Sequence, residues 1–183
     1  DGNRLNNIRQ SNTSKQNGMY FSGCINLDIE NCYVYRTVES GIQVTGRDGT
    51  PSSNVKLLDN IVDDTWAEGI VAFDGVSNLT VYRNTSSRNG ELANGGYSGI
   101  TILRNITNAD IQYNITFSNT IDGLAIDGGG LQNKNITAKN NISYSNRMAG
   151  IALHGTIDSE ITYNECYDNL LDGMFIGDSS DSD

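Results

Sequence analysis

The chain has 183 residues, of which 12 are Lys or Arg and 22 are Asp or Glu, so its formal net charge is −10. This length suits one domain with a sizeable core, and a single proline with 19% charged residues argues against a disordered linker. A nucleic-acid partner is disfavoured, because phosphate contacts need a concentrated basic face. No apolar run approaches the roughly 18 residues that a membrane span needs.

Asparagine and glycine recur in three columns along the chain. The first column contains Asn7, Asn31, Asn60, Asn84, Asn114, Asn141 and Asn164. The second, five residues later, contains Asn12, Asn89, Asn119, Asn146 and Asn169, with Arg36 and Thr65 as exceptions. The third contains Gly18, Gly41, Gly69, Gly99, Gly123, Gly150 and Gly173. Seven repeats at intervals of 23 to 30 residues indicate a solenoid.

Each repeat predicts three short strands. One precedes the first asparagine, as at 27–29, 79–81 and 161–163, and another follows it, as at 115–117 and 142–144. A third follows the glycine, where the first and third residues are apolar in all seven copies, so one face is buried. Three strands per turn predict an all-β fold, a single-stranded right-handed parallel β-helix of about seven coils over residues 1–178. Residues 179–183 are expected to form a polar tail.

The asparagine columns predict ladders along the axis of the solenoid. Asparagine tolerates the left-handed backbone of a sharp turn, and its amide can bond the amide of the next coil. Most tyrosines are expected to fill or flank the coil interior, where aromatic rings stack between turns. Neither terminus reads as a polar cap, which predicts a segment of a larger protein whose ends adjoining domains or subunits cover.

The Asn-x-x-x-x-Asn…Gly-Ile-x-Ile repeat resembles the β-helix repeats of the pectate-lyase-like superfamily. Within it, the repeats look most like those of mannuronan C5-epimerases and of methanogen disaggregatase-type surface enzymes. The resemblance implies an extracellular or cell-surface domain that acts on a uronate-containing polysaccharide as a lyase, a hydrolase or an epimerase. The epimerase signature Tyr-Gly-Phe-Asp-Pro-His is absent from this chain. In the epimerases the histidine of that signature lies four residues after the glycine, and the same position in this chain is Asp127 after Gly123 and His154 after Gly150.

If the first and third residues after each glycine are buried, the second and fourth face solvent. Adjacent coils are about 4.8 Å apart, so Asp127 and His154 would be stacked neighbours, with Arg104 below and Asp178 above. His154 could remove a proton next to a sugar carboxylate, with Asp127 orienting its ring and Arg104 neutralising the substrate. Ca²⁺ held by Asp127 and Asp178 is a candidate for the neutralising role, and Tyr97 and Tyr20 are candidate sugar-binding residues.

Two alternatives stay open. Asp127 and Asp178 lie two coils apart, roughly 9 to 10 Å, which is near the upper end of the carboxyl separation in inverting glycosidases. Asp127 and His154 also each precede a glycine, where polar residues commonly mark the end of a strand. On that second interpretation the chain is a non-enzymatic solenoid that binds glycan or spaces other domains on a surface or spike.

Overall fold

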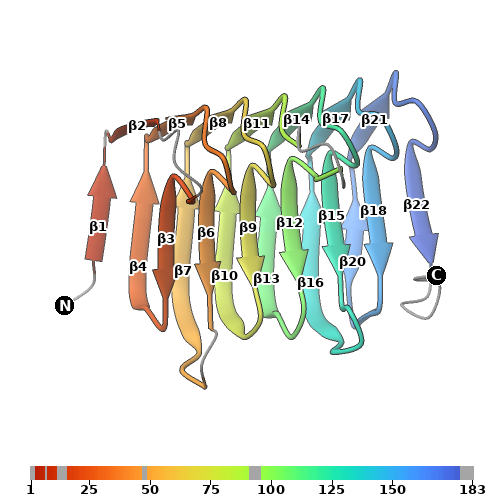
Figure 1. The fold of residues 1–183 in the computed structure, drawn as a ribbon. Coiled ribbons are helices and arrows are strands. Elements are labelled where there is room, and N and C mark those ends of the chain that lie inside the picture. The colour runs from red at the N-terminus through yellow and green to blue at the C-terminus, as the bar shows by residue number, and fades with distance from the viewer. Residues whose placement is uncertain (1–2, 7, 12–15, 47–48, 91–95, 178–183) are drawn as a thin grey trace.

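The computed structural model describes residues 3–6, 8–11, 16–46, 49–90 and 96–177. These residues form strands and turns without a helix, and the coils stack along one axis from the N-terminal to the C-terminal end (Figure 1). It follows that no helix in the described ranges is long and apolar enough to cross a membrane. The predicted polar tail, residues 179–183, lies outside the described residues.

The strands form three parallel sheets. The long-strand sheet contains β1 (Asn3–Asn6), β4 (Ile25–Glu30), β7 (Ser52–Leu58), β10 (Val76–Tyr82), β13 (Thr107–Gln112), β16 (Asn133–Lys139), β19 (Thr156–Ile157) and β20 (Glu160–Thr162). The short-strand sheet contains β2 (Arg9–Ser11), β5 (Tyr33–Tyr35), β8 (Ile61–Asp63), β11 (Thr85–Ser87), β14 (Ile115–Phe117), β17 (Ile142–Tyr144) and β21 (Glu165–Tyr167). The Gly-strand sheet contains β3 (Met19–Ser22), β6 (Ile42–Thr45), β9 (Ile70–Phe73), β12 (Ile100–Leu103), β15 (Leu124–Asp127), β18 (Ile151–His154) and β22 (Met174–Gly177).

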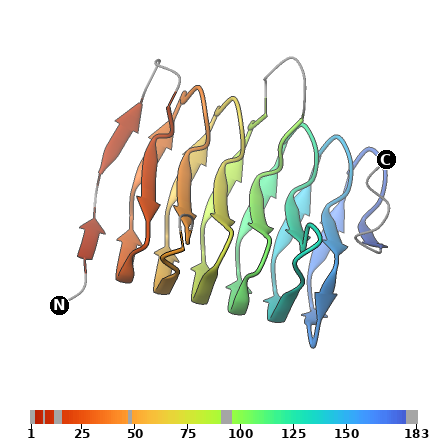
Figure 2. The same cartoon turned by 60° about the horizontal axis from the view of Figure 1, so that its bottom comes forward.

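The order of strands in each sheet follows the order of coils in the chain, so every coil lies on the one before it (Figure 2). The chain passes seven times through the Gly-strand sheet and seven times through the short-strand sheet. The prediction of three strands per turn and about seven coils is therefore confirmed. The glycine column is confirmed as well, since the residues that follow these glycines pair in register along the whole sheet.

The core consists of apolar columns that run along the axis. Ile100, Leu124 and Ile151 are cross-strand partners on successive coils, and each is at most 1% exposed. Because equivalent residues lie directly above one another, every coil covers the apolar face of its neighbour. In the last described coil, Met174 and Ile176 occupy the same columns and are 41% and 68% exposed. The covering of the two ends by adjoining domains or subunits stays a prediction.

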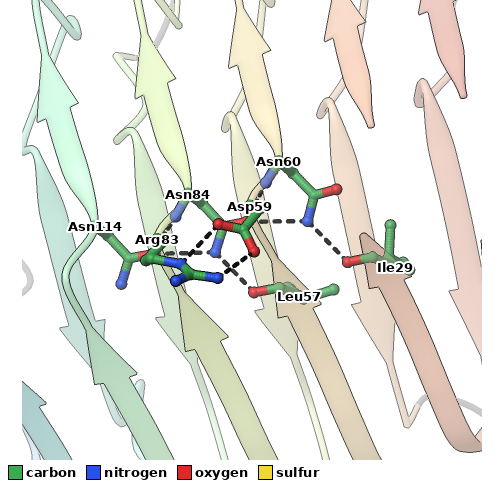
Figure 3. Close-up of polar contacts among 7 residues, drawn as sticks. All are labelled: Ile29, Leu57, Asp59, Asn60, Arg83, Asn84 and Asn114. Carbon is green, nitrogen blue, oxygen red and sulfur yellow. Dashed lines mark hydrogen bonds and ion pairs between the residues drawn. The ribbon is translucent and has the colours of Figure 1, made fainter. Parts of the chain in front are cut away.

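Asparagine side chains stack inside the turn between the long-strand and short-strand sheets. Asn60 Nδ2 donates to Asn84 Oδ1 at 2.9 Å, and Asn84 Nδ2 donates to Asn114 Oδ1 at 3.0 Å (Figure 3). The same amides donate to main-chain carbonyls, as Asn84 Nδ2 does to Leu57 O at 2.8 Å. We call Asn60, Asn84, Asn114, Asn141 and Asn164 the inner asparagine row. Its hydrogen bonds satisfy polar groups that the turn removes from water.

The predicted columns are wrong by one residue in the second coil. The buried positions there are Cys32 and Thr37, whereas Asn31 and Arg36 are exposed. Cys32 N donates to Asn60 Oδ1 at 3.0 Å, which places the cysteine at the start of the inner row. Thr65 is confirmed in the second column, since its Oγ1 donates to Asn89 Oδ1 at 2.8 Å. The first-coil members, Asn7 and Asn12, lie outside the described residues.

The reason for this shift is that two consecutive residues share the roles assigned to one asparagine. Asn31 and Arg36 have φ of 52° and 53°, and the residue before the row asparagine is left-handed in later coils too, as at Arg83 and Tyr113. The left-handed residue makes the turn, and the next residue points its side chain inward. An asparagine can take either position, so the residue type alone does not fix the register.

A second stack of asparagines, on the outside of the long-strand sheet, was not predicted. It consists of Asn26, Asn54, Asn78, Asn108 and Asn135, which are exposed and left-handed and whose side chains are hydrogen-bonded at 2.8 to 3.1 Å. Each of them directly precedes a buried residue of its strand, as Asn78 precedes Leu79. That recurrence was available in the sequence.

Replacing Asn114 with alanine is expected to lower the free energy of unfolding by about 1–3 kcal/mol. The change leaves Val81 O without its donor at 2.9 Å and removes the acceptor of Asn84 Nδ2 in a buried turn. Chemical denaturation measures the effect. Asn78→Gly, which keeps the left-handed backbone in the exposed row, is the control and should cost less than about 0.5 kcal/mol. Equal losses would contradict a stabilising role for the inner row.

Candidate functional site

The predicted catalytic residues lie at the ends of neighbouring strands in the Gly-strand sheet. Asp127 of β15 and His154 of β18 are cross-strand partners, as expected. Asp127 Oδ1 accepts a hydrogen bond from Gly129 N at 2.7 Å, which fixes this carboxylate in the turn after β15. Asp127 therefore has a structural role, and the hydrogen bonds of the described residues do not join its side chain to His154.

Arg104 follows β12, one coil before Asp127, but its side chain contacts other groups. Its main-chain N donates to Asp127 O at 2.8 Å, while its guanidinium carbon lies 5.6 Å from the ring centroid of Phe73. Its aliphatic stem packs against Gly129, where an added Cβ would lie 2.7 Å from Arg104 Cγ. None of the ion pairs in the described ranges includes Arg104, and its role in neutralising a substrate carboxylate stays a prediction.

The structure does not bring the predicted sugar-binding tyrosines together with His154. Tyr20 is 50% exposed on β3, five strands from β18 and thus roughly 24 Å along the sheet. Tyr97 is partly buried, and its N–H donates to Thr120 Oγ1 at 3.1 Å.

Asp178 lies outside the described residues, so the Asp127–Asp178 pair and Ca²⁺ between the two carboxylates stay predictions. Within the described part of the chain, no group of three or more His, Cys, Asp or Glu side chains could hold a metal ion. Of the carboxylates proposed to bind Ca²⁺, Asp127 already uses one oxygen in its turn.

The prediction that every second and fourth residue after the glycine faces solvent is wrong in several coils. Val71, Thr101 and Ala152 alternate with the core residues, yet they are only 4%, 7% and 3% exposed. Thr45, a fourth residue, is fully buried. Turn residues of the same and the next coil shelter the outer face of the sheet, as Met148 and Leu171 do around Ala152.

That shelter creates a hollow of about 290 Å³ on the outer face of the sheet, which we call the His154 hollow. It is lined by Asp122, Met148, Ala149, Ala152, His154, Leu171, Asp172 and Phe175. The imidazole of His154 lies against Phe175, with ring centroids 5.1 Å apart. The hollow thus combines a titratable imidazole, two carboxylates and an aromatic ring in mainly apolar surroundings, which is a common composition of a ligand site.

Asp122, like Asp172, is a residue of this hollow that the sequence analysis missed. Its Oδ1 accepts a hydrogen bond from Ala149 N of the next coil at 2.9 Å. Burial raises the pKa of the Asp122 carboxyl, against smaller opposing effects of that N–H and of the His154 charge. Asp122 and His154 line the same hollow, whereas Asp127 does not, so Asp122 is better placed than Asp127 to share a reaction with the imidazole.

A sequence signal for Asp122 exists in the column that directly precedes the repeated glycines. This column has an acidic residue in alternate coils, at Glu68, Asp122 and Asp172. Glu68 Oε2 accepts a hydrogen bond from Ser40 Oγ at 2.9 Å, and burial raises the pKa of the Glu68 carboxyl. Two of these three acids are therefore held by a neighbouring coil beside the Gly-strand sheet.

Replacing Glu68 with glutamine is expected to stabilise the protein at neutral pH. Because burial raises the folded-state pKa of Glu68, the folded protein holds its proton to higher pH than the unfolded chain, and stability falls as pH rises through that window. Glutamine stays neutral and keeps an oxygen for Ser40 Oγ. Thermal denaturation at several pH values should show the advantage shrinking as the pH falls from the raised pKa of Glu68 to the ordinary pKa of glutamate. An advantage that is independent of pH would contradict this account.

Known proteins share this architecture. A sequence family described as a right-handed β-helix region matches residues 1–86. The structure of the periplasmic alginate epimerase AlgG superposes with a TM-score of 0.76 at 23% identity, covering 91% of this chain. The chain is a right-handed parallel β-helix. The A-module of the mannuronan C-5 epimerase AlgE6 from Azotobacter vinelandii superposes on 95% of this β-helix with a TM-score of 0.61 at 11% identity.

These likenesses confirm the resemblance to mannuronan C5-epimerases at the level of fold. The β-helix covers 37% of the AlgG chain and 56% of the AlgE6 module, so it spans only part of each enzyme. No curated protein matches its sequence. Its chemistry must therefore be argued from its own residues.

Proposed function

We propose that this β-helix is a carbohydrate-active domain that binds an extracellular, uronate-containing polysaccharide along the Gly-strand sheet and acts on it at the His154 hollow. The main observation in favour of this proposal is that His154, Asp122 and Asp172 line one hollow together with Phe175. The alginate epimerases that share the fold support a polysaccharide as the substrate, and the periplasmic location named for AlgG supports an extracytoplasmic one.

In a lyase reaction, His154 takes the proton on the carbon next to the sugar carboxylate. The electron pair of that C–H bond forms a carbon–carbon double bond, and the glycosidic C–O bond breaks. Asp122, whose carboxyl has a raised pKa, donates a proton to the leaving oxygen. In an epimerase reaction the electron pair stays on that carbon as a carbanion stabilised by the sugar carboxylate, the carbanion takes a proton from water on its opposite face, and no glycosidic bond breaks.

A hydrolase reaction is supported by the second carboxylate of the hollow. Asp122 and Asp172 lie two coils apart, which corresponds to roughly 9 to 10 Å between equivalent backbone positions. This is near the upper end of the carboxyl separation in inverting glycosidases. Asp122 would protonate the leaving oxygen, and Asp172 would take a proton from the attacking water.

The second candidate function is a non-enzymatic solenoid that binds glycan or spaces other domains. It is favoured by the turn role of Asp127 and by the position of the Arg104 guanidinium over the ring of Phe73. Under this function the His154 hollow would be a binding subsite, with Phe175 as its apolar wall.

Incubation of the protein with polymannuronate, polygalacturonate and a neutral β-glucan tests the proposal. Unsaturated uronate absorbance reports a lyase, new reducing ends without that absorbance report a hydrolase, and deuterium uptake from heavy water without cleavage reports an epimerase. Binding without any of these products would favour the non-enzymatic solenoid. Neither binding nor product with any polymer would contradict both functions.

A further inference from the structure

A column of outward side chains on the short-strand sheet is interrupted in its middle. The column contains Tyr35, Asp63, Ser87, Phe117, Tyr144 and Tyr167. The prediction that most tyrosines fill or flank the coil interior is therefore corrected here, because these rings stack on the outside. Phe117, Tyr144 and Tyr167 stack with centroids 5.0 Å apart and nearly parallel planes, at 6° and 2°.

At the interruption, two consecutive coils carry the short side chains of Asp63 and Ser87 between the ring of Tyr35 and that of Phe117. A hollow of about 290 Å³ lies there, lined by Tyr33, Tyr35, Arg36, Asp63, Asp64 and Arg88. We call it the short-strand notch. Two coils correspond to roughly 9 to 10 Å along the axis, so the notch has the dimensions of a single sugar ring rather than of a protein segment.

The floor of the notch is internally satisfied. Asp63 is only 8% exposed, and its Oδ1 accepts a hydrogen bond from Ser87 Oγ at 2.8 Å. Its other oxygen, Oδ2, is paired with Arg88 Nη2. A buried carboxylate with both oxygens occupied fixes the shape of the floor and the direction of Arg88, and its charge is matched locally.

The rim of the notch offers unused donors. Arg36 Nε contacts Asp64 Oδ2 at 3.2 Å, and the side chains of Arg36 and Arg88 are 73% and 61% exposed. A guanidinium has five N–H groups, and these contacts with Asp64 and Asp63 use one from each arginine. Arg9 lies beside the same rings, 5.2 Å from the centroid of Tyr35.

The notch and its surroundings lack the excess negative charge of the chain. The lining residues carry two positive charges, on Arg36 and Arg88, and two negative charges, on Asp63 and Asp64. The neighbouring Arg9 brings the local net charge to +1 in a chain of −10. Free guanidinium N–H groups can bind a carboxylate, which is planar, and the neighbouring aromatic ring can pack against an apolar face of the same ligand.

We propose that the short-strand notch binds a carboxylate-bearing pyranose, one uronate unit of an acidic polysaccharide. The sugar carboxylate meets Arg36 and Arg88, and the C–H face of the ring packs on Tyr35. The notch lies on a different sheet from the His154 hollow and shares no residue with it. The site therefore stands whether or not the protein has catalytic activity.

Calorimetric titration of the whole chain with a short oligomannuronate tests this site. Arg36→Gln should weaken binding about fivefold or more, because one charged hydrogen bond to the ligand is lost from an exposed rim. Arg83→Gln is the matched control, since Arg83 is 57% exposed and pairs with Asp59 at 2.7 Å outside the notch (Figure 3). It removes the same charge and should change the Kd less than twofold.

Each further outcome supports or overturns the site. Equal weakening in Arg83→Gln and Arg36→Gln would show a general charge effect and overturn the proposal, as would an unchanged Kd in Arg36→Gln. His154→Ala should leave this binding intact. If binding were lost in the His154→Ala variant, the ligand would bind at the Gly-strand sheet and not in the notch. A neutral oligoglucan should bind at least about fivefold more weakly. Displacement of the oligomannuronate by sulfate at similar concentration would reduce the notch to a simple anion site and contradict recognition of a sugar.

Discussion

Replacing Ile126 with aspartate is expected to unfold the coils around it and to lower the free energy of unfolding by at least about 4 kcal/mol. Ile126 is fully buried, and its cross-strand partners are Ile102 and Leu153 on the adjacent coils. A carboxylate there has no polar partner within the apolar column. Because the total free energy of unfolding of a domain is about 5–15 kcal/mol, the loss should lower the denaturant concentration at the midpoint of unfolding strongly.

The neighbouring substitution Ala125→Asp is the control for this prediction. Ala125 is half-buried and points to the outer face of the Gly-strand sheet, next to Thr101 and Ala152. An aspartate at this position can reach solvent, so the loss should stay near 1 kcal/mol. If Ala125→Asp were the more damaging change, the inside and outside of the sheet would be exchanged, and the His154 hollow would lie in the core.

The second large effect is expected on catalysis. His154→Ala should lower kcat on the true polysaccharide by about 10²-fold or more, because a positioned base contributes that much to proton transfer. The stability of the fold should change little, since His154 lies on the outer face and its main contact is the exposed ring of Phe175. Steady-state kinetics with denaturation of the same samples separates the two effects. Full turnover in this variant would exclude His154 as the base.

Asp122→Asn and Asp127→Asn form a matched pair for the second catalytic group. Both lie in the fifth coil, both remove one charge, and in both the new amide keeps an acceptor for the main-chain N–H of Ala149 or Gly129. Asp122→Asn should lower kcat by about 10²-fold, and Asp127→Asn by less than tenfold. The reverse order would favour the pairing that the sequence predicted, with Asp127 beside the imidazole.

The repeat in the sequence determined the fold because its period has only one compact solution. Strands of two to seven residues that turn at Asn or Gly cannot bury their apolar face alone, so they must stack coil on coil. This logic placed Asp127 beside His154 correctly, because both are counted from a column glycine. The column glycines are a reliable starting point for counting, because at each of them from Gly18 to Gly150 an added Cβ would lie less than 3.0 Å from a neighbouring atom.

Tertiary structure decided the features that depend on neighbours from other coils. Asn31 and Cys32 could each start the inner row, and only the stacking of Asn60 on Cys32 selects the cysteine. Arg104 turns toward Phe73 because the ring and Gly129 offer it space and contact. Asp122 enters the hollow because the main chain at Ala149, 27 residues later, holds its carboxylate. Such contacts join residues that are one coil apart. The repeat in the sequence predicts the spacing of these residues but not the direction in which their side chains point.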